Sequence, residues 1–545
     1  MTGQLRQPIL VLLFVCAAFT CVASAAVCAL ALAGHIAYET PFILKLVVRI
    51  VAFGGVAVAV GIALKRTRSD AGERPTPPSS DARWSLALIP CVIAALIAFP
   101  RLGATPHVEP DEWHHLDVAR NLAVHGLYAS GNQEDGFILF DDYDSVGPPV
   151  ILPVAAAMRL GGPDLESARV VMALFFVVFA GVTFAFVAPV FGGWAAVASS
   201  VLALGAWGSA YLGRALYGEV PALMFLLLAL IAGRAAIQRS HPWRWGVVAG
   251  AMFGLAILSK YYLLMAVWPL MGAFVLDRVT ARQIRWPHIA GPAIGSVAIL
   301  ASWSAVQTFA ERNVSDAAGG QLSMYQHNIL FGIEGVENTI GFLAARPAST
   351  LALIAGLLFG TWLTRRHIAD PTVAALWLFA AFQWYWWIFF NTGNLPRYSW
   401  YGWATTAVLL GPLLRMLVES LRAPLTDQRL SRPLAVACCA ALVVPAAART
   451  VQETLRAYRS DEMESTRALA RYIASRPDED RIATAFWPLE RSIQFLSGRT
   501  VARLGDMDTP NEYDVVLVNA DSNVQWIHGR PAKRFGPYAA ITVHD

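Results

Sequence analysis

The stretch VVMALFFVVFAGVTFAFVAPV, residues 170–190, carries no charged side chain and is long enough to cross the hydrocarbon core of a bilayer as one helix. Comparable apolar runs lie near residues 8–33, 42–64, 84–100, 192–211, 220–237, 246–260, 261–276, 289–309, 348–364, 371–390, 400–418 and 432–448. The sequence therefore predicts an all-α polytopic membrane protein with about 13 transmembrane helices.

The composition excludes several other classes of protein. Hydrophobic residues make up 56% and charged residues only 15% of the 545 positions, whereas soluble domains carry about 25% charged residues. Too little charge is present to cover several soluble domains, and the hydrophobicity excludes a disordered chain. With 42 Lys and Arg against 38 Asp and Glu, nothing indicates nucleic-acid binding. The 6 Cys all lie in apolar runs without a CxxC spacing, so neither a disulfide framework nor a zinc ribbon is indicated.

Basic residues in the short loops predict the orientation. Lys and Arg collect in the loops that follow the apolar runs at 42–64, 220–237, 261–276, 348–364 and 400–418. These loops all lie on one side of the membrane when successive runs cross it in alternating directions. That side is predicted to be cytoplasmic, with the N-terminus inside. The polar stretches 101–165, 212–219, 310–346 and 391–399, and the tail from about 449, are then outside.

Three regions follow from this pattern. Residues 1–83 are predicted to form an accessory helix pair and a cytoplasmic linker rich in Pro and Ser. Residues 84–448 are the predicted transmembrane catalytic domain. Residues 449–545 are the predicted extracytoplasmic α/β domain, with an amphipathic helix over 461–476 and short strands at 482–486 and 515–518.

The first outer loop contains the sequence Glu109-Pro110-Asp111-Glu112-Trp113-His114-His115. Proline followed by two acids predicts a helix start, and Trp113 predicts that this helix lies in the membrane interface. The two carboxylates have three readings, which these residues leave open. They could compensate the helix dipole, provide a general base beside a lipid-borne substrate, or form a metal face with His115.

Five segments in this order resemble the GT-C membrane glycosyltransferases, in the branch of the protein O-mannosyltransferases and the lipid A aminoarabinose transferase. The segments are Asp111-Glu112 with Ala119-Arg120-Asn121-Leu122 and Gly126; Gly147-Pro148-Pro149-Val150 with Gly161-Gly162; Arg214 to Pro221; Gly250 to Tyr261; and Pro396-Arg397-Tyr398. The resemblance covers residues 84–420. It departs from the family at Gly147, where many relatives have Lys.

The resemblance implies an inverting transfer of a sugar from a polyprenyl phosphate to a hydroxyl of a glycan, lipid or protein acceptor, on the outer face of the plasma membrane. Asp111 is then the expected base. The implied set comprises catalytic Asp111, Glu112 and Glu219, phosphate-binding Lys260, Arg397 and Arg214, and substrate-binding His115, Tyr261, Tyr398 and His327. No metal ligands are assigned, and a divalent cation is allowed by the sequence without being required by it.

Two alternatives remain from the residues themselves. A transporter or flippase of a lipid-linked glycan is the rival function, although such a protein would place ionisable groups near mid-membrane and show an internal repeat. The run Trp384-Tyr385-Trp386-Trp387 is interpreted as an interfacial aromatic belt, with a wall for sugar or prenyl chain as the alternative.

Overall fold

The computed structural model describes residues 12–13, 15–17, 83–132, 136–140, 145–279, 283–310, 341, 343–344, 350, 354, 370–390, 396–422, 444, 448, 450–456, 458–459, 461–484, 487–504, 512–520 and 531–543. The chain divides into two compact units. Unit 1 comprises residues 1–94, 177–210 and 219–450. Unit 2 comprises residues 95–176, 211–218 and 451–545.

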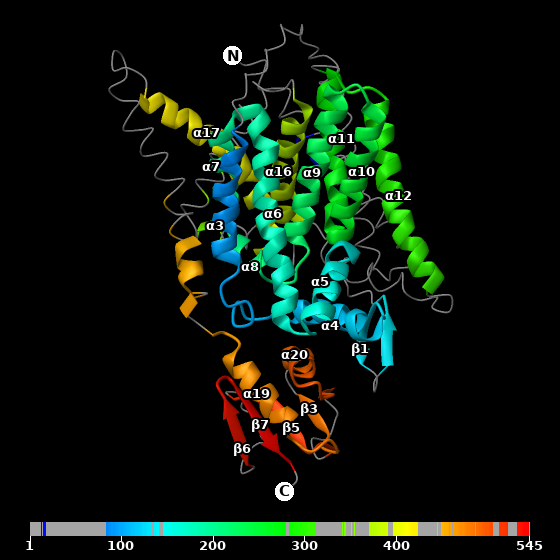
Figure 1. Ribbon diagram of the computed structural model, residues 1–545, viewed down its shortest axis with the longest axis vertical. Helices are drawn as coiled ribbons and strands as arrows, with labels where there is room; N and C mark the ends of the chain where they lie inside the picture. Colours follow the sequence, from blue (N-terminus) through cyan, green and yellow to red (C-terminus); the bar gives the residue numbers. More distant parts are fainter. Residues whose placement is uncertain are drawn as a thin grey trace, which may run out of the picture. The chain divides into compact units, whose positions relative to one another are not determined.

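Unit 1 is helical in its described part, as the apolar runs predict. Its elements are η1 (Trp84–Ala87), most of α3 (Leu88–Ala98), the second half of α6 (Leu165–Phe191), α7 (Gly193–Leu204), the start of α8 (Ser209–Leu212), α9 (Glu219–Gln238), α10 (Pro242–Ser259), η2 (Tyr261–Ala266), α11 (Val267–Val279), α12 (Pro287–Ala310), α16 (Pro371–Phe390), η3 (Pro396–Ser399) and α17 (Trp400–Arg422). Figure 1 shows α9 and α10 running alongside one another, and these two helices are in contact.

Three described helices, α6, α9 and α12, are long and apolar enough to cross a membrane. They coincide with the predicted spans at 166–190, 220–237 and 289–309. α12 leaves Ile294, Val297 and Phe309 exposed, which suits a surface that faces lipid. The predicted run at 42–64 lies outside the described residues, as does all of the run at 348–364 except residues 350 and 354. The total of about 13 spans stays a prediction.

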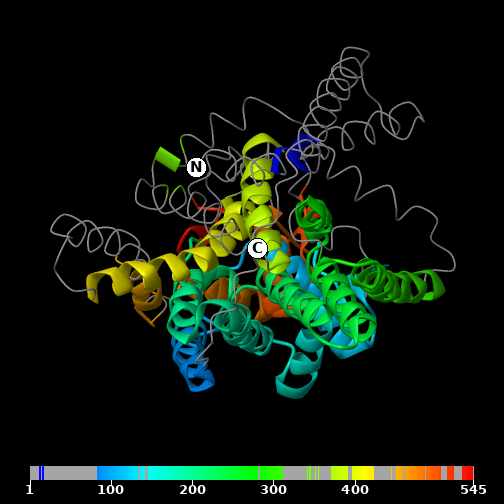
Figure 2. The same cartoon turned by 90° about the horizontal axis from the view of Figure 1, so that it is seen from above.

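Glycines bring α10 and α12 into close contact, and Figure 2 shows these green helices side by side from above. A Cβ added at Gly250 would lie 2.0 Å from the carbonyl oxygen of Pro292, and one at Gly295 would lie 2.1 Å from that of Val247. Backbone therefore meets backbone at this crossing, as small residues allow between membrane helices.

Gly250→Ala is expected to destabilise the protein by about 1–3 kcal/mol, because the new methyl group would force two backbones apart. Gly233→Ala is the matched control: it also lies in a helix of unit 1, and a Cβ there meets nothing within 4 Å. Thermal unfolding of both variants in detergent checks this prediction. Equal unfolding midpoints would show that the crossing is not closely packed.

Unit 2 combines the first loop with the tail of the chain. The loop gives α4 (Pro110–His125), an antiparallel hairpin of β1 (Ala129–Asn132) and β2 (Gly136–Leu139), and α5 (Pro148–Gly161). The tail gives α19 (Glu464–Ala474), β3 (Ile482–Thr484), α20 (Trp487–Ser497), β4 (Ala502–Arg503), β5 (Val515–Asn519), β6 (Ala532–Phe535) and β7 (Tyr538–Thr542).

The tail strands form one mixed sheet in the order β4-β3-β5-β7-β6, drawn in orange and red in Figure 1. β3 pairs in parallel with β4 and β5, while β7 pairs antiparallel with β5 and β6. β5 is buried on both faces: Val515 and Leu517 pack with α19 and α20 residues, and Val516 and Val518 pack with Ile541. The boundary predicted at residue 449 stays a prediction.

Candidate functional site

Helix α4 carries the first group of candidate residues and begins where the sequence predicts. Glu109 is the extended N-cap residue, Pro110 occupies the first helical turn, and Asp111 and Glu112 follow it. The helix ends at Gly126, whose φ of 73° is the left-handed conformation that glycine adopts without strain. The acids therefore sit at the positive end of the helix dipole.

Glu112 is fully buried and paired with Arg169 of α6. Arg169 Nε donates to Oε1 at 3.1 Å and Nη2 donates to Oε2 at 3.0 Å, and the backbone N–H of Leu216 donates to Oε1 at 3.0 Å. Both side chains have no exposed surface. A bidentate pair with further hydrogen bonds is the arrangement in which buried charges are tolerated. Glu112 thus connects α4 to two other segments of unit 2.

Asp111 differs from its neighbour because it is half-buried. Next to it, Glu109 is exposed and accepts a hydrogen bond from the Tyr217 hydroxyl at 3.1 Å. His115, one turn along α4, is buried edge-on to the Tyr217 ring at 6.5 Å between centroids. The adjacent acids Asp111 and Glu112 therefore occupy different environments: Glu112 is buried in an ion pair, whereas Asp111 is partly exposed to solvent.

Arg214 is buried, and it holds the loop that leads into α4. Its Nη2 donates to the carbonyl oxygens of Pro100 and Thr105 and to Thr105 Oγ1. Burial, together with the nearby guanidinium of Arg169, lowers the pKa of Arg214 to about 10, so that it stays charged at neutral pH. These Nη2 donors are committed to the loop, and a phosphate role for Arg214 stays a prediction.

The tail contacts α4 and the same loop. The backbone N–H groups of Glu462 and Met463 donate to the Ala104 carbonyl, at 3.0 and 3.2 Å, and the N–H of His107 donates to Glu462 Oε2 at 2.8 Å. On α4, Asp117 pairs with Arg491 at 3.2 Å. The tail therefore supports the segment that presents Asp111.

Trp113 of α4 is buried, and its ring packs on Phe495 of α20 with 5.3 Å between centroids. Its side chain therefore contacts protein, and its level relative to the lipid headgroups stays a prediction. The tail supplies an apolar partner for this face of α4, and a reading of the helix by itself could not include that partner.

In unit 1, two predicted residues meet. Lys260 Nζ lies 3.5 Å from Glu219 Oε1, and both side chains are buried. The pairing follows from topology, because α9 and α10 form an antiparallel hairpin in which the start of α9 lies beside the end of α10. α10 ends at Ser259, and Lys260 is its extended C-cap. Within the described residues, no hydrogen bond reaches either carboxylate oxygen of Glu219.

Aromatic rings surround Tyr262, which lies two residues after Lys260. Tyr262 packs on Trp386 at 4.5 Å and on Tyr401 at 5.5 Å, and its hydroxyl donates to Gln383 Oε1. Tyr398 lies 6.1 Å from Tyr262. Arg397 is half-buried, with its guanidinium carbon 5.3 Å from the Tyr398 ring centroid. The predicted Tyr261 is half-buried, whereas Tyr262 and Tyr401, which the sequence analysis did not single out, occupy the cluster.

The interpretation of the tryptophan run as an interfacial belt is wrong. Trp384, Trp386 and Trp387 are all buried, and Trp384 packs edge-on to Trp403 of α17 at 4.8 Å. Composition places aromatic rings at an interface, but here α17 supplies its own rings to cover them.

Two further points concern the predicted set. His327 lies outside the described residues. Among the described residues, no group of three or more His, Cys, Asp and Glu side chains is arranged to hold a metal ion, and Glu112 is already paired with Arg169.

Arg169, which holds Glu112, is a further residue that sequence reasoning missed. Its signal was present, since an arginine inside an otherwise apolar span usually has a buried partner.

Comparison with known proteins supports the motifs. The protein-family model described as dolichyl-phosphate-mannose-protein mannosyltransferase matches residues 146–304. This range contains three of the five segments that carry the resemblance, from Gly147 to Tyr261, while Asp111 and Arg397 lie outside it. No curated protein matches the chain.

Solved structures share the fold over most of the chain. ArnT from Cupriavidus metallidurans, bound to undecaprenyl phosphate, is 13% identical with a TM-score of 0.60, and the match covers 85% of this chain and 99% of ArnT. In the apo state ArnT is 12% identical with a TM-score of 0.56, over 84% of this chain and 97% of ArnT. The oligosaccharyltransferase AglB from Archaeoglobus fulgidus, with an inhibitory peptide and a dolichol-phosphate, is 12% identical with a TM-score of 0.51, over 80% of this chain and 69% of AglB. The resemblance of this mostly helical chain to the GT-C membrane glycosyltransferases is therefore confirmed, by the family model over part of its length and by the fold over most of it.

Proposed function

We propose that this protein transfers a sugar from a polyprenyl-phosphate donor to a hydroxyl group of a glycan, lipid or protein acceptor. The fold similarity to ArnT and AglB, which were solved with undecaprenyl phosphate and dolichol-phosphate, supports the donor class. The observation that carries the proposal is that the two adjacent carboxylates at the start of α4 lie in different environments. Glu112 is held by Arg169, while Asp111 is half-buried at the positive end of the helix.

In this mechanism the acceptor oxygen attacks the anomeric carbon of the donor sugar. The new carbon–oxygen bond forms as the bond to the phosphate oxygen breaks, and the configuration inverts in this single displacement. The acceptor proton passes to the Asp111 carboxylate, and polyprenyl phosphate leaves with the electron pair. General-base action of this kind contributes about 10²–10⁴-fold to the rate.

Lys260 and Arg397 are proposed to stabilise the leaving phosphate, Lys260 as a point charge and Arg397 through paired N–H donors. The buried pair of Lys260 with Glu219 supports this role. Since the Glu219 oxygens accept no hydrogen bond from the described residues, its charge is compensated mainly by Lys260. Glu219 is proposed to orient the ammonium group and to receive a sugar hydroxyl.

The reaction is proposed to occur at the outer face of the plasma membrane. Two observations support this: the distribution of Lys and Arg predicts that the basic loops lie on the opposite, cytoplasmic side, and α6, α9 and α12 are long and apolar enough to span a membrane. No step in this mechanism passes through a cation, although the sequence allows a divalent cation without requiring one.

The test is mass spectrometry of envelope glycans and lipids from cells with and without the gene, complemented by wild type or by Asp111→Asn. The expected result is one sugar-bearing species that disappears without the gene, returns with wild type and does not return with the variant. Identical envelopes in all strains would overturn the proposal.

A further inference from the structure

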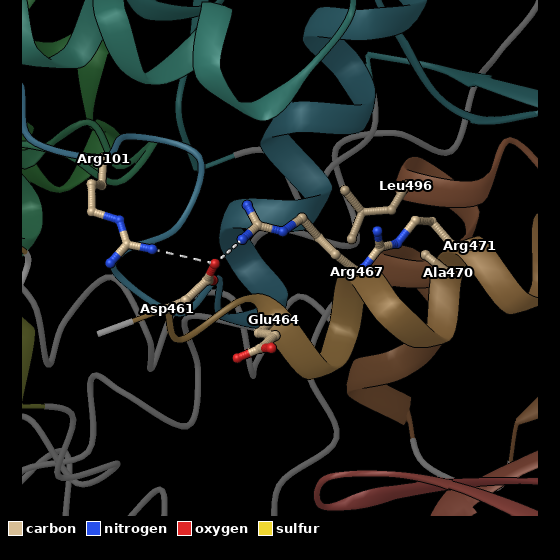
Figure 3. Close-up of a pocket in the computed structure, with 7 residues that line it drawn as sticks. All are labelled: Arg101, Asp461, Glu464, Arg467, Ala470, Arg471 and Leu496. Atoms are coloured by element: carbon tan, nitrogen blue, oxygen red, sulfur yellow. Dashed lines mark hydrogen bonds and ion pairs between the residues drawn. The ribbon is translucent and has the colours of Figure 1, made fainter. Parts of the chain in front are cut away.

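Unit 2 contains a cavity of about 620 Å³ beside α19, away from the carboxylates of α4. It is lined by Arg101, Asp461, Glu464, Arg467, Ala470, Arg471 and Leu496. Figure 3 shows Arg101 and Arg467 extending toward Asp461 from opposite sides, with Arg471 one turn further along α19 and Leu496 contributed by α20. Three guanidinium groups and two carboxylates thus share one small volume.

The two acids do not make this cavity a cation site. Asp461 Oδ2 accepts a hydrogen bond from Arg467 Nη2 and lies 3.5 Å from Arg101 Nη2. Asp461 Oδ1 accepts a hydrogen bond from the backbone N–H of Met463 at 3.1 Å. Glu464 is exposed in the first turn of α19, where a carboxylate suits the helix dipole, and Figure 3 shows it pointing away from Arg467. The aspartate is therefore fully engaged, and the glutamate faces elsewhere.

The arginines, by contrast, have guanidinium N–H groups that form no hydrogen bond within the described residues. Each guanidinium has five N–H groups. Besides Asp461, Arg467 donates to the Gly103 carbonyl at 2.7 Å, and Arg101 donates to the Tyr458 carbonyl at 3.4 Å. The Arg471 guanidinium is exposed and makes no hydrogen bond or ion pair within the described residues. The guanidinium N–H groups of these arginines that make no hydrogen bond outnumber the acceptors in the cavity. The cavity therefore favours an anion with several oxygens.

The exposed apolar residues that precede Arg101 indicate the source of such an anion. The last turn of α3 and the residues after it leave apolar side chains exposed, with Leu96 at 58% and Phe99 at 39%, and Arg101 follows two residues later. An apolar surface that ends in an arginine is typical of the boundary between acyl chains and headgroups. The cavity also includes Leu496 and the methyl group of Ala470, which suit the carbon atoms next to a lipid phosphate.

We propose that this cavity binds the phosphate of a phospholipid headgroup, with Arg471 and the remaining donors of Arg101 and Arg467 on its oxygens. This site is independent of the sugar-transfer function proposed above. The bound lipid would bridge the loop after α3 to α19, and the Arg101–Asp461 pair already joins this loop to the residues just before α19.

Native mass spectrometry of the full-length protein in detergent tests this proposal, with short-chain phosphatidylglycerol and inorganic phosphate as separate probes. Wild type is expected to retain phosphatidylglycerol. Arg471→Gln is expected to weaken that binding about tenfold or more, since a charge-assisted contact is lost. Arg481→Gln is the matched control, because its exposed side chain pairs only loosely, at 3.8 Å, with Asp514 outside the cavity. Its binding should equal that of wild type.

Two results would overturn the proposal. One is equal retention of phosphatidylglycerol by wild type and Arg471→Gln; the other is saturable binding of inorganic phosphate without binding of the lipid. Because the Arg471 side chain makes no hydrogen bond or ion pair within the described residues, the variant should keep the thermal unfolding midpoint of wild type. That measurement separates loss of the site from loss of the fold.

Discussion

Asp111→Asn is expected to lower the rate of sugar transfer by about 10²–10⁴-fold while leaving the fold intact. Asparagine keeps the size of the side chain and its place at the start of α4, but its amide cannot accept the acceptor's proton. The fully buried residues of α4 and the pair of Glu112 with Arg169 remain unchanged in this variant. The measurement is the initial rate of transfer by purified protein, compared at equal amounts of folded enzyme.

Asp478→Asn is the matched control, since Asp478 is also in unit 2 and its side chain is fully exposed. It should transfer at the wild-type rate. A rate for Asp111→Asn within a few-fold of wild type would remove Asp111 from the role of base, whatever the identity of the sugar.

Arg169→Met is expected to cost about 3–5 kcal/mol of stability, because it leaves the Glu112 carboxylate buried without its counter-ion. The pair has no exposed surface, and Arg169 also donates to the Leu102 carbonyl at 3.0 Å. One substitution therefore releases α4, α6 and the loop before α4 together. Thermal or chemical unfolding in detergent, followed by tryptophan fluorescence, checks the magnitude.

The double variant Arg169→Met with Glu112→Leu distinguishes an ion pair from mere packing. Removing both charges should recover part of the stability lost in Arg169→Met, because no uncompensated charge then stays buried. If the two losses simply add, the pair does not stabilise α4 in the way described.

Local patterns predicted much of the fold. Long apolar runs located α6, α9 and α12 because a bilayer demands long apolar helices. The Pro-Asp-Glu sequence located the start of α4, and Ser259-Lys260 marks the end of α10. Even the pairing of Glu219 with Lys260 follows from a helical hairpin with a short turn, although the sequence analysis placed each residue without joining them.

Features that depend on distant partners could not be predicted. Glu112 and Arg169 are separated by a loop, a hairpin and α5, so nothing local shows that they pair. Trp113 and the run from Trp384 to Trp387 have the composition of interfacial residues, but α20 and α17 cover them. In each case the contacting residue lies on another helix. The pattern of polar and apolar residues along one helix does not show which other helix covers it.

The most direct test follows a polyprenyl-phosphate-linked sugar in liposomes that contain the purified protein, using mass spectrometry to measure release of polyprenyl phosphate. With an acceptor extract present, wild type is predicted to convert the donor to polyprenyl phosphate and a glycosylated product, and Asp111→Asn is predicted to leave it intact. A donor that changes leaflet with its sugar–phosphate bond unbroken would contradict a transferase and identify a flippase.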